Sequence, residues 1–241
     1  MWFDYLTSEP AKAEKFFRTL FGWTVQTMTM STGPYTLIMN NGVAIGGFQA
    51  PLPDTPSYRY SEPYSRWSPH FIIENGHESS GKVKTRGGKV LREPSALLDM
   101  GRLVVALDAN GTGFSMRQPV TVQPDPGWAG PPNSFCWAEL YTLNASSSVS
   151  FYKTIVGFTE TKSALPDGTY HMLEKDGAPR AGARHPMSGM QTGWFAWVRV
   201  PDLVQTVHKA QQLDSTVIMP PGNNMALLVD PYGCALGLAQ V

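Results

Sequence analysis

A long internal repeat constrains this sequence more than any other feature. The segment WFDYLTSEPAKAEKFFRTLFGW, which starts at Trp2, recurs as WAELYTLNASSSVSFYKTIVGF, which starts at Trp137. The offset of 135 residues (137 − 2) then continues without a gap through Tyr35/Tyr170, Gly42/Gly177 and Gly47/Gly182. A repeat of this length indicates that the chain folds as copies of one structural unit, because each copy has the same pattern of core positions.

Each copy predicts a strand, a helix and three short strands. WFDYLT alternates with period two, whereas the apolar residues of AKAEKFFRTLF recur at helical spacing. Gly22 and Gly157 follow the predicted helices, where a residue with positive φ is often needed. Asn41-Gly42 and Asp176-Gly177 predict tight hairpins between antiparallel strands.

A weaker second pair of segments follows the first pair and has the same order of elements. Val90 and Val217 differ by 127 positions, whereas Asp108 and Asp230 differ by 122, so the two segments differ in loop length. We therefore predict four βαβββ modules and an α+β fold. Modules 1 and 2 form a domain over residues 1–118, the proline- and glycine-rich stretch 119–134 is a linker, and modules 3 and 4 form a second domain over residues 135–241.

This arrangement resembles the vicinal oxygen chelate superfamily, which includes glyoxalases, bleomycin-resistance proteins and extradiol dioxygenases. The resemblance rests on the βαβββ modules, on helices ending in the pattern of FYKTIVGF, and on a last strand introduced by DPYG. It covers nearly the whole chain and indicates a tandem glyoxalase-like protein. It implies that two modules pair into an eight-stranded, cup-shaped sheet with helices outside.

The resemblance also implies where metal ligands would lie, namely at the head of a module's first strand and in its last strand. Our alignment places Trp2 and Trp137 at the first-strand position of modules 1 and 3, and Ser68 and Phe195 at that of modules 2 and 4, with His70 and Trp197 two residues on. Counting from the turn glycines, the last-strand position holds Gly46, Ser115, Ala181 and Gly237. Since His70 alone among these residues is a usual metal ligand, we predict no metal and no other cofactor.

A carboxylate follows the first tryptophan of each repeat, two residues along the strand and therefore on the same face. These carboxylates are Asp4 and Glu139. We predict that pairing of the modules brings Asp4 near His70, an arrangement that suits acid–base catalysis. The alternative is structural: both carboxylates bind backbone donors or an arginine, and His70 lies at a loop edge after Pro69.

Tryptophans are the other candidates for ligand binding. We predict that Trp2, Trp137 and Trp197 line the two cups together with Glu139. A further aromatic group lies in proline-rich stretches: Tyr58, Tyr60, Tyr64, Trp67 and Trp128. These residues either cap a cup or join the domains, and we predict that Trp67 contacts the ligand.

The charge pattern narrows the choice of partner. The 19 basic and 19 acidic residues cancel and are scattered, so neither nucleic acid nor a membrane surface is expected as a partner. A small hydrophobic or aromatic molecule, or a second copy of the chain in a homodimer, remains. The start of the sequence has no secretion signal, so we expect a cytoplasmic protein.

Three functional hypotheses follow. The first is a metal-free protein that sequesters or senses a small aromatic molecule, as resistance proteins do. The second is a lyase, isomerase or hydroxylase that uses Asp4 and His70. The third is a structural protein whose cups are filled by its own side chains and whose function lies in oligomer contacts.

Overall fold

Four modules of the predicted type make up the computed structural model, which describes residues 1–30, 33–50, 65–97, 101–122, 127–188 and 190–240. Module 1 contains β1 (Phe3–Thr7), α1 (Pro10–Phe21), β2 (Thr24–Met30), β3 (Gly33–Asn40) and β4 (Val43–Gln49). Module 2 contains β5 (Ser65–Ile72), α2 (Gly76–Thr85), β6 (Lys89–Ala96), β7 (Gly101–Leu107) and β8 (Gly113–Pro119). Module 3 contains β9 (Phe135–Tyr141), α3 (Ala145–Val156), β10 (Thr159–Leu165), β11 (Gly168–Lys175) and β12 (Ala178–Arg184). Module 4 contains β13 (Gly193–Val200), α4 (Leu203–Gln212), β14 (Thr216–Gly222), β15 (Met225–Val229) and β16 (Ala235–Gln240).

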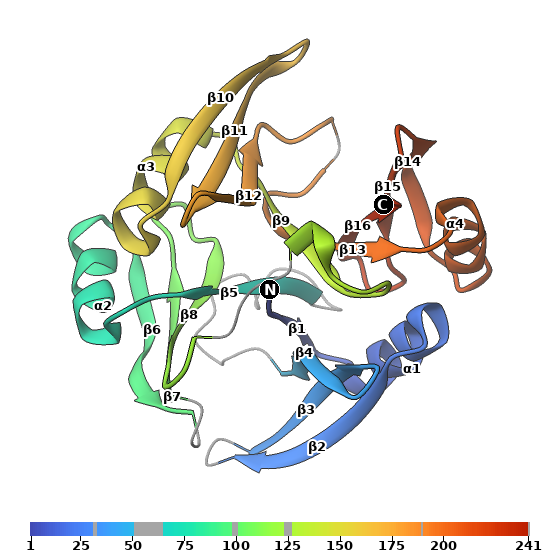
Figure 1. Ribbon diagram of the computed structural model, residues 1–241, viewed down its shortest axis with the longest axis horizontal. Coiled ribbons are helices and arrows are strands. Elements are labelled where there is room, and N and C mark those ends of the chain that lie inside the picture. Colours follow the sequence, from blue (N-terminus) through green and yellow to red (C-terminus); the bar gives the residue numbers. More distant parts are fainter. Residues whose placement is uncertain (31–32, 51–64, 98–100, 123–126, 189, 241) are drawn as a thin grey trace.

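The modules pair in chain order and form two eight-stranded mixed sheets (Figure 1). The strand order is β2-β3-β4-β1-β5-β8-β7-β6 in the first sheet and β10-β11-β12-β9-β13-β16-β15-β14 in the second. In each sheet the first strands of the two modules pair antiparallel at the centre, and each pairs parallel with the last strand of its own module. The α+β fold with four βαβββ modules is therefore confirmed.

The local signals in the sequence act as expected. Pro10 begins α1, and Gly22 ends it in the left-handed conformation with φ of 74°. Between β3 and β4, Asn41 and Gly42 both have positive φ, at 50° and 78°, as a tight two-residue hairpin requires. Within the described ranges, no helix is long and apolar enough to cross a lipid bilayer.

One continuous core joins the two sheets on their helix-bearing faces. Helices α1 and α4 lie side by side, as do α2 and α3 on the other side of the molecule (Figure 1). Aromatic rings cross between the sheets: Trp67 lies 5.3 Å from Phe135 and Phe71 lies 5.1 Å from Trp194, measured between ring centroids. The two halves of the chain are thus packed against each other.

Two buried aspartates reinforce this junction from the loops that precede β8 and β16. Asp108 accepts hydrogen bonds from two backbone N–H groups of its own loop and from the hydroxyl of Tyr152, at 3.1 Å. Asp230 does the same in its loop and accepts from the hydroxyl of Tyr5 at 2.6 Å. Because each tyrosine belongs to the other half of the chain, the aspartate of the DPYG pattern has a structural role.

Candidate functional site

We call the face of the first sheet opposite its helices the first cup, and the corresponding face of the second sheet the second cup. In the first cup, the carboxylate of Asp4 on β1 has all of its hydrogen-bonding capacity in use. Its two oxygens accept four hydrogen bonds: Oδ1 from the indole of Trp2 (3.1 Å) and the hydroxyl of Tyr35 (2.6 Å), and Oδ2 from the amide of Gln49 (2.7 Å) and Nε2 of His70 (2.9 Å). The side chain is 2% exposed. A buried carboxylate with four donors is an anion whose acceptor capacity is used up, so Asp4 orients its neighbours and has no capacity left for a ligand.

His70 donates one of the four hydrogen bonds that Asp4 accepts. Its side chain is 3% exposed and comes from the middle of β5, where its backbone N–H donates to the carbonyl of Trp2. Because Asp4 accepts at Nε2, the proton is assigned to that nitrogen, and Nδ1 of the neutral ring carries a lone pair. In the described part of the chain, Nδ1 is buried and has no hydrogen-bond partner.

The predicted proximity of Asp4 and His70 is therefore confirmed. The two residues lie diagonally across the pair of strands β1 and β5. Asp4 is directly opposite Ser68, and His70 is opposite Trp2. The expectation that His70 lies at a loop edge is wrong, because Pro69 is accommodated inside β5 opposite Phe3.

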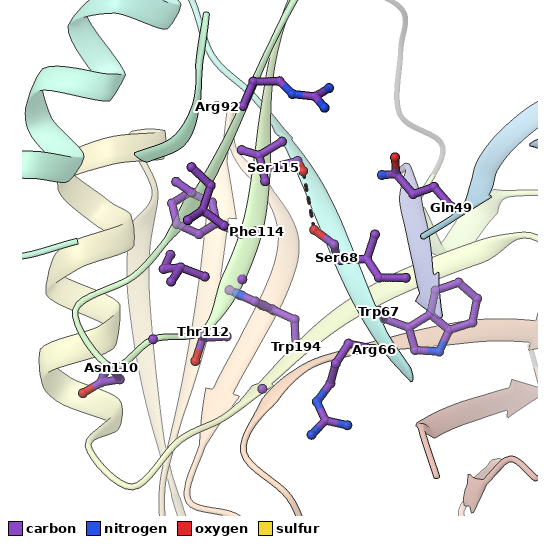
Figure 2. A pocket seen from close by; sticks show the side chains of 18 of the residues that line it. Gln49, Arg66, Trp67, Ser68, Arg92, Asn110, Thr112, Phe114, Ser115 and Trp194 are labelled. Carbon is purple, nitrogen blue, oxygen red and sulfur yellow. Dashed lines mark hydrogen bonds between the residues drawn. The ribbon is translucent and has the colours of Figure 1, made fainter. Parts of the chain in front are cut away.

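A cavity of about 260 Å³ adjoins this cluster and is lined by residues of the first sheet and by Thr192, Gly193 and Trp194 of the second half (Figure 2). Apolar residues of β7, including Leu103, Val105 and Leu107, form much of its wall. Figure 2 shows Gln49, Arg92, Ser68 and Ser115 around one part of the cavity, with 3.5 Å between the two serine hydroxyls. Since Gln49 also binds Asp4, and Ser115 pairs with His70 in the sheet, the cavity and the buried cluster share a boundary.

The second cup repeats the carboxylate but not the histidine. Glu139 accepts the indole N–H of Trp137 at 2.7 Å and the hydroxyl of Tyr170 at 3.0 Å, both at Oε2. Burial raises the pKa of Glu139 to about 7, although these two hydrogen bonds and the charge of Arg184 act in the opposite direction.

The second cup is also filled by its own side chains. Trp137 and Trp197 form a buried cluster with Cys136 and Leu227. The tryptophan Trp128 and a group of methionines pack against this cluster: Met172, Met187, Met190 and Met219. The indole of Trp197 covers Gly237 so closely that a Cβ atom there would lie 2.0 Å from the ring. Trp137 and Trp197, which we expected to line an open cup, thus fill this one.

The matches to sequence relatives extend over nearly the full length of both chains. DauV, an anthracycline biosynthesis protein of Streptomyces sp. strain C5, is 25% identical over 257 residues, which cover 100% of this chain and 92% of DauV. CFP32 of Mycobacterium tuberculosis, provisionally named a glyoxylase, is 26% identical over 253 residues, which cover 99% of this chain and 93% of CFP32. No family model matches the sequence.

The fold has a counterpart among solved structures. The Mn(II)-bound glyoxalase of Novosphingobium aromaticivorans superposes with a TM-score of 0.66 at 11% identity, over 99% of this chain and 80% of the glyoxalase. The chain has the fold of the vicinal oxygen chelate proteins and is similar in sequence to proteins named after glyoxylase and anthracycline biosynthesis. Its tandem glyoxalase-like organisation follows from the two eight-stranded sheets.

The residues of this chain do not fit a metal centre at the expected positions. In the odd modules the cup-facing last-strand residues are Gly47 and Gly182, which pair with Asp4 and Glu139, so our placement at Gly46 and Ala181 is wrong by one residue. A Cβ at Gly47 would lie 2.2 Å from the hydroxyl of Tyr35, which leaves no room for a carboxylate side chain. Among the described residues, no three His, Cys, Asp or Glu side chains are grouped as metal ligands would be.

Several predicted contacts differ from expectation. Trp67 lies in β5, not in a loop, and packs in the core against Phe3 and Tyr5 while one edge borders the cavity. Trp128 packs against Trp137 in a tilted arrangement, with 5.7 Å between ring centroids, and so covers part of the second cup. Three of the candidate loop aromatics lie outside the described residues: Tyr58, Tyr60 and Tyr64.

Tyr35 and Gln49, which bind Asp4, were not predicted as site residues, nor was Arg117, whose guanidinium carbon lies 5.3 Å from the ring centre of Trp2. A signal for the first was present, because Tyr35 and Tyr170 match in the 135-residue repeat and bind the two carboxylates in the same way. Gln49 and Arg117 have no such signal, since their counterparts in the repeat, Arg184 and Ala239, differ in chemistry.

Glu139→Gln is expected to remove a pH dependence of stability. The folded-state pKa of about 7 exceeds the ordinary value of 4.5, so the folded state binds more protons between these values and wild-type stability falls as pH rises through them. Above pH 7 the buried charge of Glu139 lowers the free energy of unfolding by its full cost, about 3 kcal/mol for this pKa shift. The glutamine variant has no charge at this position and does not lose this free energy. Unfolding by guanidinium at pH 5 and pH 8 measures the difference.

The control is Glu93→Gln on the exposed side of β6, which should show no such trend. A stability difference between Glu139→Gln and wild type that stays constant from pH 5 to pH 8 would show that the buried carboxyl titrates normally.

Proposed function

We propose that this protein binds a small hydrophobic or aromatic molecule in the first cup without a metal. The observation that carries the proposal is the cavity of about 260 Å³, which is lined by apolar residues of β7 and by polar side chains that include Ser68 and Ser115. Ligand sites commonly combine an apolar cavity with a few convergent polar groups. The second cup contributes to the fold, since its own aromatic and methionine side chains occupy it.

A planar aromatic ligand suits this cavity. Its walls include the apolar strand residues Leu103 and Val105 of β7. The similarity to anthracycline biosynthesis proteins supports a fused-ring aromatic compound as the ligand class.

Ser68→Phe tests the proposal, because the corresponding residue of the filled cup is Phe195. Isothermal titration with 2-naphthol should give saturable binding to the wild type and to Ser68→Ala, and none to Ser68→Phe. Equal binding by Ser68→Phe, with unchanged thermal stability, would place the ligand elsewhere. No binding by the wild type to 2-naphthol or to other fused-ring probes would contradict the proposal.

Acid–base catalysis on the bound molecule is a second candidate, and the buried, unpaired Nδ1 of His70 favours it. With Asp4 fixing the tautomer, Nδ1 is a proton acceptor on the strand position that follows Ser68, a residue that lines the cavity, on the same face of β5. The test is exchange of the acidic C–H of 2-acetyl-1-tetralone for deuterium, followed by NMR. Exchange catalysed by the wild type and lost in His70→Gln supports catalysis; exchange equal to the buffer rate points to binding alone.

A further inference from the structure

The first cup contains the arginine side chains of Arg92 and Arg117. Arg117 on β8 lies with its guanidinium carbon 5.3 Å from the ring centre of Trp2, and its Nε is buried without a hydrogen-bond acceptor. Arg92 on β6 borders the cavity. Among the described residues, neither arginine lies within ion-pair distance of a carboxylate. The nearby carboxylate of Asp4 already accepts four hydrogen bonds.

A half-buried guanidinium whose Nε donates no hydrogen bond is costly, because the desolvation of that N–H is not repaid. Burial lowers the pKa of Arg117, while the neighbouring Tyr35 and Asp4 raise it. Cation–π contact with Trp2 offsets part of the desolvation cost but leaves the Nε–H donor without an acceptor. An anionic ligand oxygen would supply what the protein itself does not.

The filled cup provides an internal comparison at the same positions of the repeat. Arg92 corresponds to Met219 and His70 to Trp197, both at the offset of 127. Ser115 corresponds to Gly237 and Arg117 to Ala239, both at the offset of 122. The sheet pairing supports these matches, since His70 pairs with Ser115 as Trp197 pairs with Gly237. Charge and hydrogen-bonding groups are thus present in the cup with the cavity and replaced by apolar residues in the filled one.

The strands connect the cavity to the unpaired groups. Ser68 and Ser115 border the cavity, and the next residues on the same face of β5 and β8 are His70 and Arg117. Two residues along a strand span about 7 Å, which is within the length of a fused two-ring aromatic molecule. A ligand with its rings in the cavity therefore reaches this end of the cup with one substituent.

We propose that the ligand is an aromatic acid whose anionic oxygen pairs with Arg117 and whose neighbouring hydroxyl donates a hydrogen bond to Nδ1 of His70. This inference rests on the proposed function and names its ligand class. Hydroxyaryl carboxylates and acidic phenols or enols have the required pair of groups. Charge-assisted hydrogen bonds to a guanidinium are the stronger kind, so the acidic group should dominate affinity.

The experiment compares 1-hydroxy-2-naphthoate with its methyl ester by isothermal titration. We expect the acid to bind the wild type about tenfold or more tightly than the ester. Arg117→Gln should weaken the acid to the level of the ester and leave the ester unchanged, whereas Arg117→Lys should retain part of the preference. Arg102→Gln, at an exposed position of β7, is the matched control and should change neither.

The outcomes separate this inference from the proposed function. If acid and ester compete for one site with equal affinity, or if Arg117→Gln binds the acid as the wild type does, the acidic-group assignment is wrong while the first cup remains a binding site. If neither compound nor 2-naphthol binds, both proposals fall. Circular dichroism of each variant checks that a variant that does not bind is still folded.

Discussion

Asp4→Asn is expected to lower the free energy of unfolding by about 3 to 5 kcal/mol. The carboxylate accepts hydrogen bonds from Trp2, Tyr35, Gln49 and His70, and an amide in its place would present an NH₂ donor to at least one of these donors. Buried donors that lose their acceptor retain the cost of desolvation. Guanidinium unfolding at pH 7, followed by far-UV circular dichroism, measures the loss.

Glu139→Gln is the matched control for this prediction, because it makes the same change of carboxylate to amide at the equivalent position of the repeat. The carboxyl of Glu139 receives two donors on one oxygen, and burial raises its pKa to about 7. The glutamine variant should therefore be as stable as the wild type or more stable at pH 7. A loss of less than 1 kcal/mol for Asp4→Asn, or similar losses for both variants, would contradict the difference between the two cups.

Trp197→Ala is expected to cost about 4 kcal/mol, because removal of a buried tryptophan leaves a cavity that the surroundings fill only in part. The indole of Trp197 is 6% exposed and lies against Gly237, so no backbone substituent occupies the space beneath it. Guanidinium unfolding measures the loss, and Trp197→Phe, which keeps a ring in place, should lose much less.

Added indole should partly rescue Trp197→Ala. Indole that occupies the vacated space binds the folded state and stabilises it, by about 1.4 kcal/mol at a concentration ten times its dissociation constant. The wild type and Trp197→Phe, whose cup is full, should gain nothing at this site. A small loss for Trp197→Ala, with no effect of indole specific to this variant, would show that the ring does not fill the second cup.

The repeat made the fold predictable. The matched positions specified four copies of one module, and local signals such as Gly22 and Asn41-Gly42 marked where helices and hairpins end. The proximity of Asp4 and His70 was also predictable, because the cup faces of two antiparallel central strands follow from period-two alternation. Their chemical roles stay a prediction.

Turn length explains the misplaced last-strand residues. In odd modules the last two strands are joined by two residues, Asn41-Gly42 or Asp176-Gly177, whereas even modules have the longer loops that contain Asp108 and Asp230. Counting the same number of residues from the turn glycine therefore ends at a cup-facing residue in even modules and at a core-facing residue in odd modules. A shift of one residue along a strand reverses the direction of the side chain.

Pro69 explains why Trp67 was assigned to a loop. A proline inside a central strand is unusual, because it removes one ladder hydrogen bond. Here it sits opposite Phe3, and the adjacent His70 N–H still bonds to the carbonyl of Trp2.

The contrast between an open first cup and a filled second cup was not predictable, because it depends on which side chains of equivalent positions meet across the sheet.

The stoichiometry of binding tests the central claim, that one cup binds and the other is filled, most directly. Isothermal titration of the full chain with 1-hydroxy-2-naphthoate should give one site per chain, abolished by Ser68→Phe in the first cup and unaffected by Trp197→Phe in the second. Two equivalent sites per chain, or a single site that survives Ser68→Phe and is lost in Trp197→Phe, would contradict the account.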